Sequence, residues 1–146
     1  MEKKDTARAI HFRETRNNRL FETVEDYTEL IIELIETQGQ VRICDIARTM
    51  GISHVSVLKT VKRLVRDGYL KKNYGIIDLT QEGEKVALFS RKKHLILSNF
   101  LLNIGVPEDI VATDVEGIEH YVSPTTLEAI DAHVKACAIS DLTYPK

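Results

Sequence analysis

The chain lacks a long hydrophobic run, and this absence argues against a membrane protein. Its most apolar stretch, residues 95–104, is interrupted by Ser98, Asn99 and Asn103, which makes it too polar to span a bilayer. The residues after Met1 are charged, and no apolar segment follows them as a signal peptide would require. We therefore expect a cytoplasmic protein without a membrane partner.

Cysteine is also scarce, and the two cysteines show no metal-binding or redox spacing. Cys44 and Cys137 are far apart in the sequence, so we expect two free thiols, with Cys44 in the core. The 146 residues are 43% hydrophobic and 29% charged. This composition is typical of a globular protein that buries one core or two small ones.

Charge is segregated along the chain. Residues 1–19 carry six basic and three acidic side chains, whereas residues 20–39 carry six acidic and no basic ones. Residues 40–75 carry eight basic and two acidic side chains, and residues 107–146 carry two basic and eight acidic ones. The central segment therefore favours a polyanion as partner, and the acidic segments favour cations.

Residues 1–22 are basic and only weakly periodic, and we interpret them as an extension that is either mobile or an arm contacting DNA or a partner subunit. Thr23 is expected to cap a helix that ends before Gly39. Asp26 and Glu29 form a carboxylate pair one turn apart on its polar side. The apolar face of this helix is expected to comprise Val24, Tyr27, Leu30, Ile31, Leu34 and Ile35.

A helix-turn-helix is predicted next. Small Ala47 lets two helices cross closely, Gly51 takes the turn, and Ser53 caps the second helix. The side expected to face inward comprises Val57, Leu58, Val61, Leu64 and Val65. The other side carries no acid, which favours contact with a DNA major groove over simple solvation. The candidate DNA-binding residues of this helix are His54, Ser56, Lys59, Thr60 and Arg63.

The chain after Gly68 is typical of the wing of a winged helix and of helices that follow it. Two short strand-like runs flank Asn73-Tyr74-Gly75, and Lys71 and Lys72 in the first run are expected to contact phosphates. Three further helices are predicted: one from the cap Thr80 to about Ile104, one after Pro107, and one from Ser123-Pro124 to about residue 136. We expect this small helical unit to pair with a second copy.

Candidate metal ligands lie in residues 114–121. In a helix, Glu116, Glu119 and His120 stand at i, i+3 and i+4, so two carboxylates and an imidazole share one face. Such a face is either a metal half-site or a solvated stripe, and a metal site would need ligands from elsewhere. Gly117 occupies a position where Ala would be favoured by about 1 kcal/mol, so we expect a close neighbour of its backbone.

Several motifs together resemble the diphtheria toxin repressor family of metalloregulators, and within it the manganese transport regulator branch, over residues 23–137. The motifs are EDYTEL at 25–30, DIARTMGIS at 45–53, LTQEGEK at 79–85, KHLILSNFL at 93–101 and DVEGIEH at 114–120.

We thus expect a mostly α protein. The resemblance implies an N-terminal winged helix-turn-helix domain over 23–80 and an all-helical metal-binding and dimerisation domain over 81–137, with a basic extension over 1–22 and a tail over 138–146.

The resemblance also implies the ligands of a pair of divalent ions. Four carboxylates and two imidazoles suit Mn²⁺ or Fe²⁺, while Zn²⁺ binding in vitro is not excluded by affinity. Iron-sensing relatives have Met and Cys where this chain has Asp26 and Glu116, so the manganese branch is favoured. The implied ligands are Asp26, Glu29, His94, Glu116, Glu119 and His120, with a backbone carbonyl near Glu116.

We expect a Mn²⁺-dependent transcriptional repressor of metal-uptake genes, and not an enzyme, that binds a palindromic double-stranded operator as a homodimer. One alternative is a repressor of the same family that responds to Fe²⁺ or to several metals. Another is a plain winged-helix protein with an acidic dimer surface. A third is a two-metal hydrolase, which would leave the basic winged helix without a role, and for which the sequence offers no additional general base.

Overall fold

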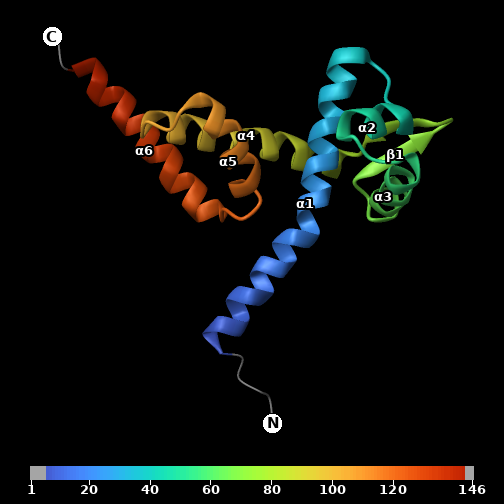
Figure 1. Ribbon diagram of the computed structural model, residues 1–146, viewed down its shortest axis with the longest axis horizontal. Coiled ribbons are helices and arrows are strands. Elements are labelled where there is room, and N and C mark those ends of the chain that lie inside the picture. The colour runs from blue at the N-terminus through green and yellow to red at the C-terminus, as the bar shows by residue number, and fades with distance from the viewer. Residues whose placement is uncertain (1–5, 144–146) are drawn as a thin grey trace. The chain divides into compact units, whose positions relative to one another are not determined.

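A computed structural model describes residues 6–143 of the chain, with side chains described up to residue 138 (Figure 1). The protein is mostly α-helical, as expected, with one two-stranded sheet. It divides into two compact units, Leu20–Ser90 (the head unit) and Arg91–Lys146 together with Met1–Arg19 (the helical unit). The elements are α1 Ala7–Gln38, α2 Ile43–Met50, α3 His54–Arg66, β1 Leu70–Asn73, β2 Ile76–Leu79, α4 Gln81–Asn103, α5 Glu108–Ile118 and α6 Pro124–Thr143.

Helix α1 begins at Ala7, so the prediction of a cap at Thr23 is wrong (Figure 1). The first turn is capped instead by Thr6, whose Oγ1 accepts a hydrogen bond from the Ala9 amide at 3.3 Å. Residues 7–22 contain neither glycine nor proline, so nothing in them interrupts the helix that the later residues propagate. The end before Gly39 is confirmed, and Gly39 has a φ of 85°.

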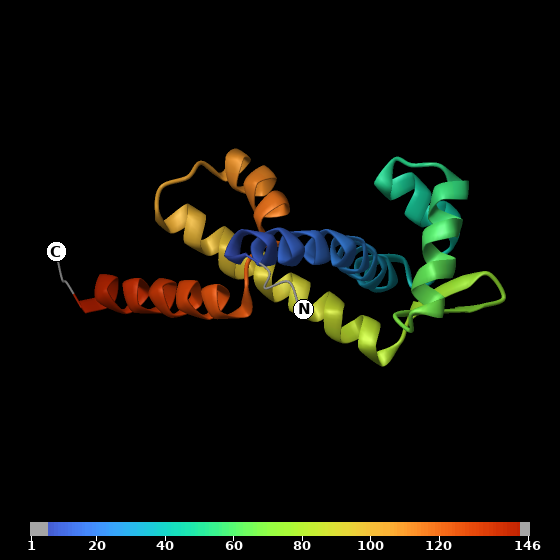
Figure 2. The same cartoon turned by 90° about the horizontal axis from the view of Figure 1, so that it is seen from below.

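The head unit contains the predicted helix-turn-helix and wing (Figure 2). Gly51 takes the left-handed conformation, and the Ser53 hydroxyl accepts from the Ser56 amide at 3.2 Å to cap α3. The inward prediction for Val65 is wrong, because that side chain is 37% exposed. The stripe that reaches the core is narrow and comprises Val57, Val61 and Leu64, and Val65 lies at its margin.

Strands β1 and β2 pair antiparallel through the turn at Tyr74 and Gly75, whose φ angles of 50° and 81° match a type I′ hairpin. Thr80 links this wing to the start of α4 through two hydrogen bonds of its hydroxyl. Its hydroxyl donates to the Gly68 carbonyl at 2.6 Å and accepts from the Gly83 amide at 3.1 Å, which confirms the predicted cap. The start of α4 is therefore hydrogen-bonded to the turn that joins α3 to β1.

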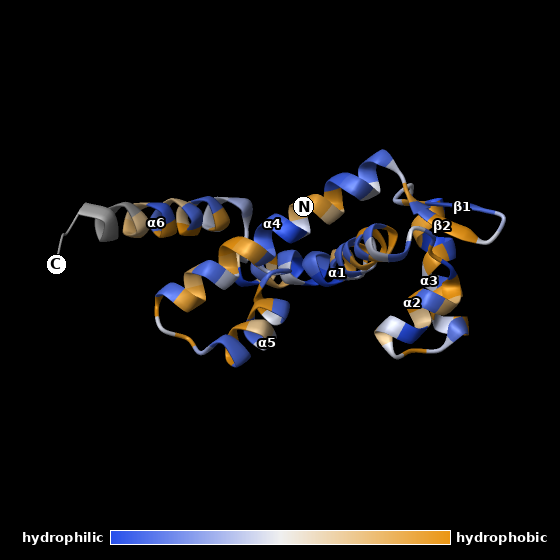
Figure 3. Cartoon of the chain, turned by 90° about the horizontal axis from the view of Figure 1, so that it is seen from above, coloured by the Kyte–Doolittle hydropathy of each residue, from blue (hydrophilic) through white to orange (hydrophobic). Residues whose placement is uncertain are grey.

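The helical unit has its own small core, formed by α4, α5 and α6. The Ser123 hydroxyl caps α6 by accepting from the Thr126 amide at 3.2 Å, as predicted, but α6 continues to Thr143 rather than ending near residue 136. Apolar and polar residues alternate along these helices (Figure 3). Among the described helices we find no candidate for a membrane span. The core side chains are Ile96, Leu97, Val111, Val115 and Leu127.

Two helical glycines have opposite surroundings. The expectation of a close neighbour at Gly117 is wrong, because an added Cβ there would meet nothing within 4 Å. A Cβ at Gly83 would overlap the carbonyl oxygen of Tyr69, which belongs to the backbone and cannot rotate away. The packing of the wing against α4 therefore requires a glycine at position 83.

The two glycines predict stability changes of opposite sign. Gly83→Ala should lower the free energy of unfolding by about 2–4 kcal/mol, because the backbone of α4 or of Tyr69 must move. Gly117→Ala should leave it unchanged or raise it by up to about 1 kcal/mol, through helix propensity. Urea unfolding of both variants without metal would measure these changes. Equal stability of wild type and Gly83→Ala would contradict the close approach at Tyr69.

Candidate metal centre and DNA-binding surface

The helical unit brings together three of the predicted metal ligands. Val111 and Val115 bury one face of α5, and Glu119 follows Val115 by one turn, with its amide bonded to the Val115 carbonyl at 2.9 Å. His94 on α4 reaches the same place, and its Nδ1 lies 3.0 Å from Glu119 Oε2. Glu116 completes the group, and one ligand atom from each of the three residues lies within 4.8 Å of the others.

Burial distinguishes this cluster from a solvated stripe. Glu119 is only 2% exposed and His120 7%, whereas Glu116 is exposed. The Nε2 atom of His120 lies 3.8 Å from Glu119 Oε1. Helix α5 ends at Ile118, so Glu119 is its C-terminal cap and His120 lies in the following turn. A carboxylate removed from water is costly unless positive charge or hydrogen bonds compensate it, and here two imidazoles approach it.

The chemistry of the cluster fits a hard or borderline divalent cation. Carboxylate oxygens and imidazole nitrogens bind such ions at about 2.0–2.6 Å, so donors on opposite sides of one ion stand about 4–5 Å apart. The ligand atoms of His94, Glu116 and Glu119 lie within 4.8 Å of one another, which is compatible with that range. The cluster includes no thiolate, and the described cysteines form no disulfide, so the donors are those that suit Mn²⁺, Fe²⁺ or Zn²⁺.

The remaining predicted ligands, Asp26 and Glu29, lie on α1 in the head unit. They are one turn apart and both are half-buried. Glu22, one turn before Asp26, has a carboxylate oxygen within 4.8 Å of that of Asp26. The sequence reasoning did not single out Glu22, although its i, i+4 spacing from Asp26 was a usable signal.

The outer face of α3 forms a basic groove. The predicted DNA-binding residues His54, Ser56, Lys59 and Arg63 are exposed and Thr60 is half-exposed. No acidic side chain lines the groove, whose walls are Ser56, Lys59, Thr60, Lys62, Arg63 and Arg66. The inner face of the same helix is held by the head core, so the polar face is presented rigidly, as recognition of base edges requires.

The wing carries two further cations of the head unit. Lys71 and Lys72 are exposed on β1, and Lys71 Nζ lies 3.5 Å from a carboxylate oxygen of Asp78 on β2. Both partners of that pair are about half exposed. Exposed ion pairs contribute about 0–1 kcal/mol, so Lys71 can exchange Asp78 for a phosphate at little cost.

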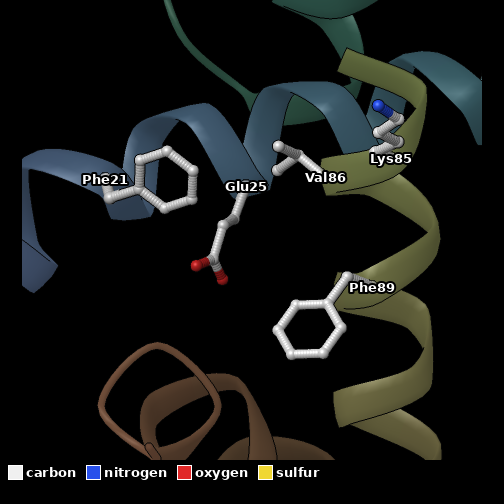
Figure 4. A pocket seen from close by; sticks show the side chains of 5 residues that line it. All are labelled: Phe21, Glu25, Lys85, Val86 and Phe89. Atoms are coloured by element: carbon white, nitrogen blue, oxygen red, sulfur yellow. The ribbon is translucent and has the colours of Figure 1, made fainter. Parts of the chain in front are cut away.

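A second hollow in the head unit lies between α1 and α4 (Figure 4). Phe21, Val86 and Phe89 form apolar walls around Glu25, and Lys85 stands at one end. Among these lining residues only Glu25 can ligate a metal ion, so this hollow is not a metal centre.

Comparison with protein families matches most of the chain. The model described as iron dependent repressor, N-terminal DNA binding domain, matches residues 19–74. The model described as iron dependent repressor, metal binding and dimerisation domain, matches residues 80–140. These two stretches contain the α3 groove and the buried cluster, respectively.

Individual relatives agree with that match. The transcriptional regulator MntR of Escherichia coli O6:H1 is 43% identical over 119 residues, which cover 81% of this chain and 77% of that one. MntR of Bacillus subtilis strain 168 is 40% identical over 110 residues, which cover 74% and 77%.

Solved structures agree as well, although the chain spans only about half of their length. A manganese-dependent transcriptional repressor in complex with manganese has a TM-score of 0.69 and 29% identity, over 77% of this chain and 52% of that one. IdeR of T. acidophilum has a TM-score of 0.67 and 26% identity, over 76% of this chain and 53% of that one. The chain belongs to the iron dependent repressor family and is similar to its MntR members.

Proposed function

We propose that this protein is a Mn²⁺-responsive transcriptional repressor that binds a palindromic operator as a homodimer and controls metal-uptake genes. The observation on which the proposal rests is the buried Glu119 carboxylate, approached by His94 at 3.0 Å and grouped with Glu116, in a chain whose α3 presents a basic groove. The similarity to MntR proteins supports manganese over iron.

The proposed ligands are Asp26 and Glu29 from the head unit with His94, Glu116, Glu119 and His120 from the helical unit, and they would hold two ions per subunit. When bound, the ions supply the positive charge that lets these carboxylates share one site. Without that charge the carboxylates repel one another, and the head unit is free to take other orientations. The ligand set therefore favours the orientation in which two heads of a dimer match successive major grooves.

In the proposed complex the two faces of the head have different roles. Lys71 and Lys72 contact phosphates, which position the head without reading sequence. Arg63, on the basic face of α3, is suited to a bidentate contact with a guanine edge. Affinity then depends on salt and wing charge, and specificity depends on α3.

The metal response should be lost when the buried cluster is changed. Glu119→Ala and His120→Ala should abolish the Mn²⁺-dependent gain in operator affinity, which we expect to be about 5–150-fold in the wild type, the usual range of allosteric coupling. The matched controls Glu128→Ala and His133→Ala, exposed on α6, should retain it. Fluorescence anisotropy with Mn²⁺ and with a chelator would measure the gain, and a full response in both cluster variants would refute the assignment.

The residue type at position 26 should determine which metal ion gives the stronger response. Asp26→Met exchanges a hard oxygen ligand for a soft thioether, so the Mn²⁺ response should weaken relative to the Fe²⁺ response. Operator binding titrated with Mn²⁺, Fe²⁺ and Zn²⁺ without oxygen would show the change, with Glu33→Met, exposed on the same helix, as the control. If Asp26→Met leaves the relative strengths of the responses to the three metals unchanged, Asp26 is not a ligand.

The hydrolase alternative is tested separately. Mn²⁺-dependent phosphodiesterase activity of the wild type would favour it.

Arg63 and Lys72 should have separable effects on DNA binding. Arg63→Ala should lower the preference for an operator, selected from a randomised duplex pool, over random DNA by about 5–150-fold, the equivalent of 1–3 kcal/mol. Lys72→Ala should weaken binding to both DNAs alike and reduce the salt slope by about 1. Competition binding at several salt concentrations would test both, and equal effects of the two substitutions on specificity would contradict the assigned roles.

A further inference from the structure

The first half of α1 differs in charge from its second half. The family model begins its match at residue 19, yet α1 is already helical from Ala7. Between residues 6 and 19 the described chain carries four arginines, no lysine and a single acid, Glu14. Residues 20–38 of the same helix then carry six acids and no base. The helix thus changes sign abruptly where the family match begins.

Three of these arginines share one stripe of the helix. Arg8, Arg16 and Arg19 stand at i, i+8 and i+11, with Phe12 at i+4, so that all four fall on one face. All four side chains are exposed, and Phe12 is 59% exposed. The Arg8 guanidinium lies 5.8 Å from the centre of the Phe12 ring, a cation–π contact that orients it. Arg13 lies away from this stripe.

The composition of the stripe indicates the chemistry of its partner. A helix face that is only solvated commonly mixes charges of both signs, and the one acid here, Glu14, lies 3.8 Å from His11 and off the stripe. Arginine presents several N–H donors in a planar fork that matches two oxygens of a phosphate, and it is weakly hydrated compared with lysine. Three exposed guanidinium groups along one helical line are therefore suited to a row of phosphates.

We propose that the stripe formed by Arg8, Phe12, Arg16 and Arg19 is a second DNA-contacting surface, which binds backbone phosphates without reading sequence. This inference rests on the proposed DNA-binding function. Each phosphate neutralised by an arginine releases condensed counterions, so the stripe adds affinity that falls steeply with salt. An acidic surface of a second copy of the chain is the competing partner, and the experiment below separates the two.

The test compares charge variants of the full chain on a fluorescent random-sequence duplex with Mn²⁺ present, across a series of salt concentrations. The triple change Arg8→Gln, Arg16→Gln and Arg19→Gln should reduce the slope of log affinity against log salt by about 2–3, at about 0.9 per phosphate. Arg13→Gln, off the stripe, should reduce it by less than about 0.5. The triple change to Lys keeps the charge and should preserve most of the slope.

Two further measurements make the outcome decisive. Lys71→Gln with Lys72→Gln serves as the positive control, since the wing belongs to the proposed function itself. If the wing variant lowers the slope and the triple Gln variant does not, the stripe proposal is overturned and the DNA-binding function stands. If wild type shows no salt-dependent DNA binding, the proposed function fails instead. A change from dimer to monomer in sedimentation, with an unchanged slope, would overturn the stripe proposal in favour of a second copy.

Discussion

The burial of the Glu119 carboxylate is the constraint on which the helical unit depends. The packing of Val111 and Val115 against Ile96 and Leu97 fixes α5 on α4, and Glu119 follows one turn later with 2% of its surface exposed. A charge so placed must be balanced, and His94 and His120 provide nitrogen atoms at 3.0 and 3.8 Å. The apolar core and the donor cluster are therefore consequences of the same helix packing.

The head unit, in contrast, presents positive charge on a rigid surface. The inner face of α3 is completely buried through Val57, Val61 and Leu64, and the outer face is polar and free of acid. Gly83 lets α4 begin against the backbone of Tyr69, so that the wing is held close to the end of α3. In the proposed regulator, recognition of DNA is assigned to the head unit's basic face and response to a cation to the buried cluster.

Local chemistry explains why much of the fold could be predicted. Ser53, Thr80 and Ser123 each cap the helix that follows, and Tyr74 with Gly75 forms the expected hairpin turn, because these signals depend only on residues a few positions apart. The predictions that were wrong concern positions where several weak conformational preferences compete. Helix α1 extends sixteen residues before Thr23, from Ala7, since a single capping threonine cannot stop a helix that has no breaker before it.

The kinds of donor available, the segregation of charge and the helical spacing of Glu116 and Glu119 follow from residue type and order alone. The complete ligand set came from family resemblance and stays a prediction. Helix packing, by contrast, places His94 beside Glu119, which is 25 residues away, and buries Glu119 but not Glu116. Burial and contact between distant residues depend on how whole helices pack, and no local sequence pattern predicts that packing.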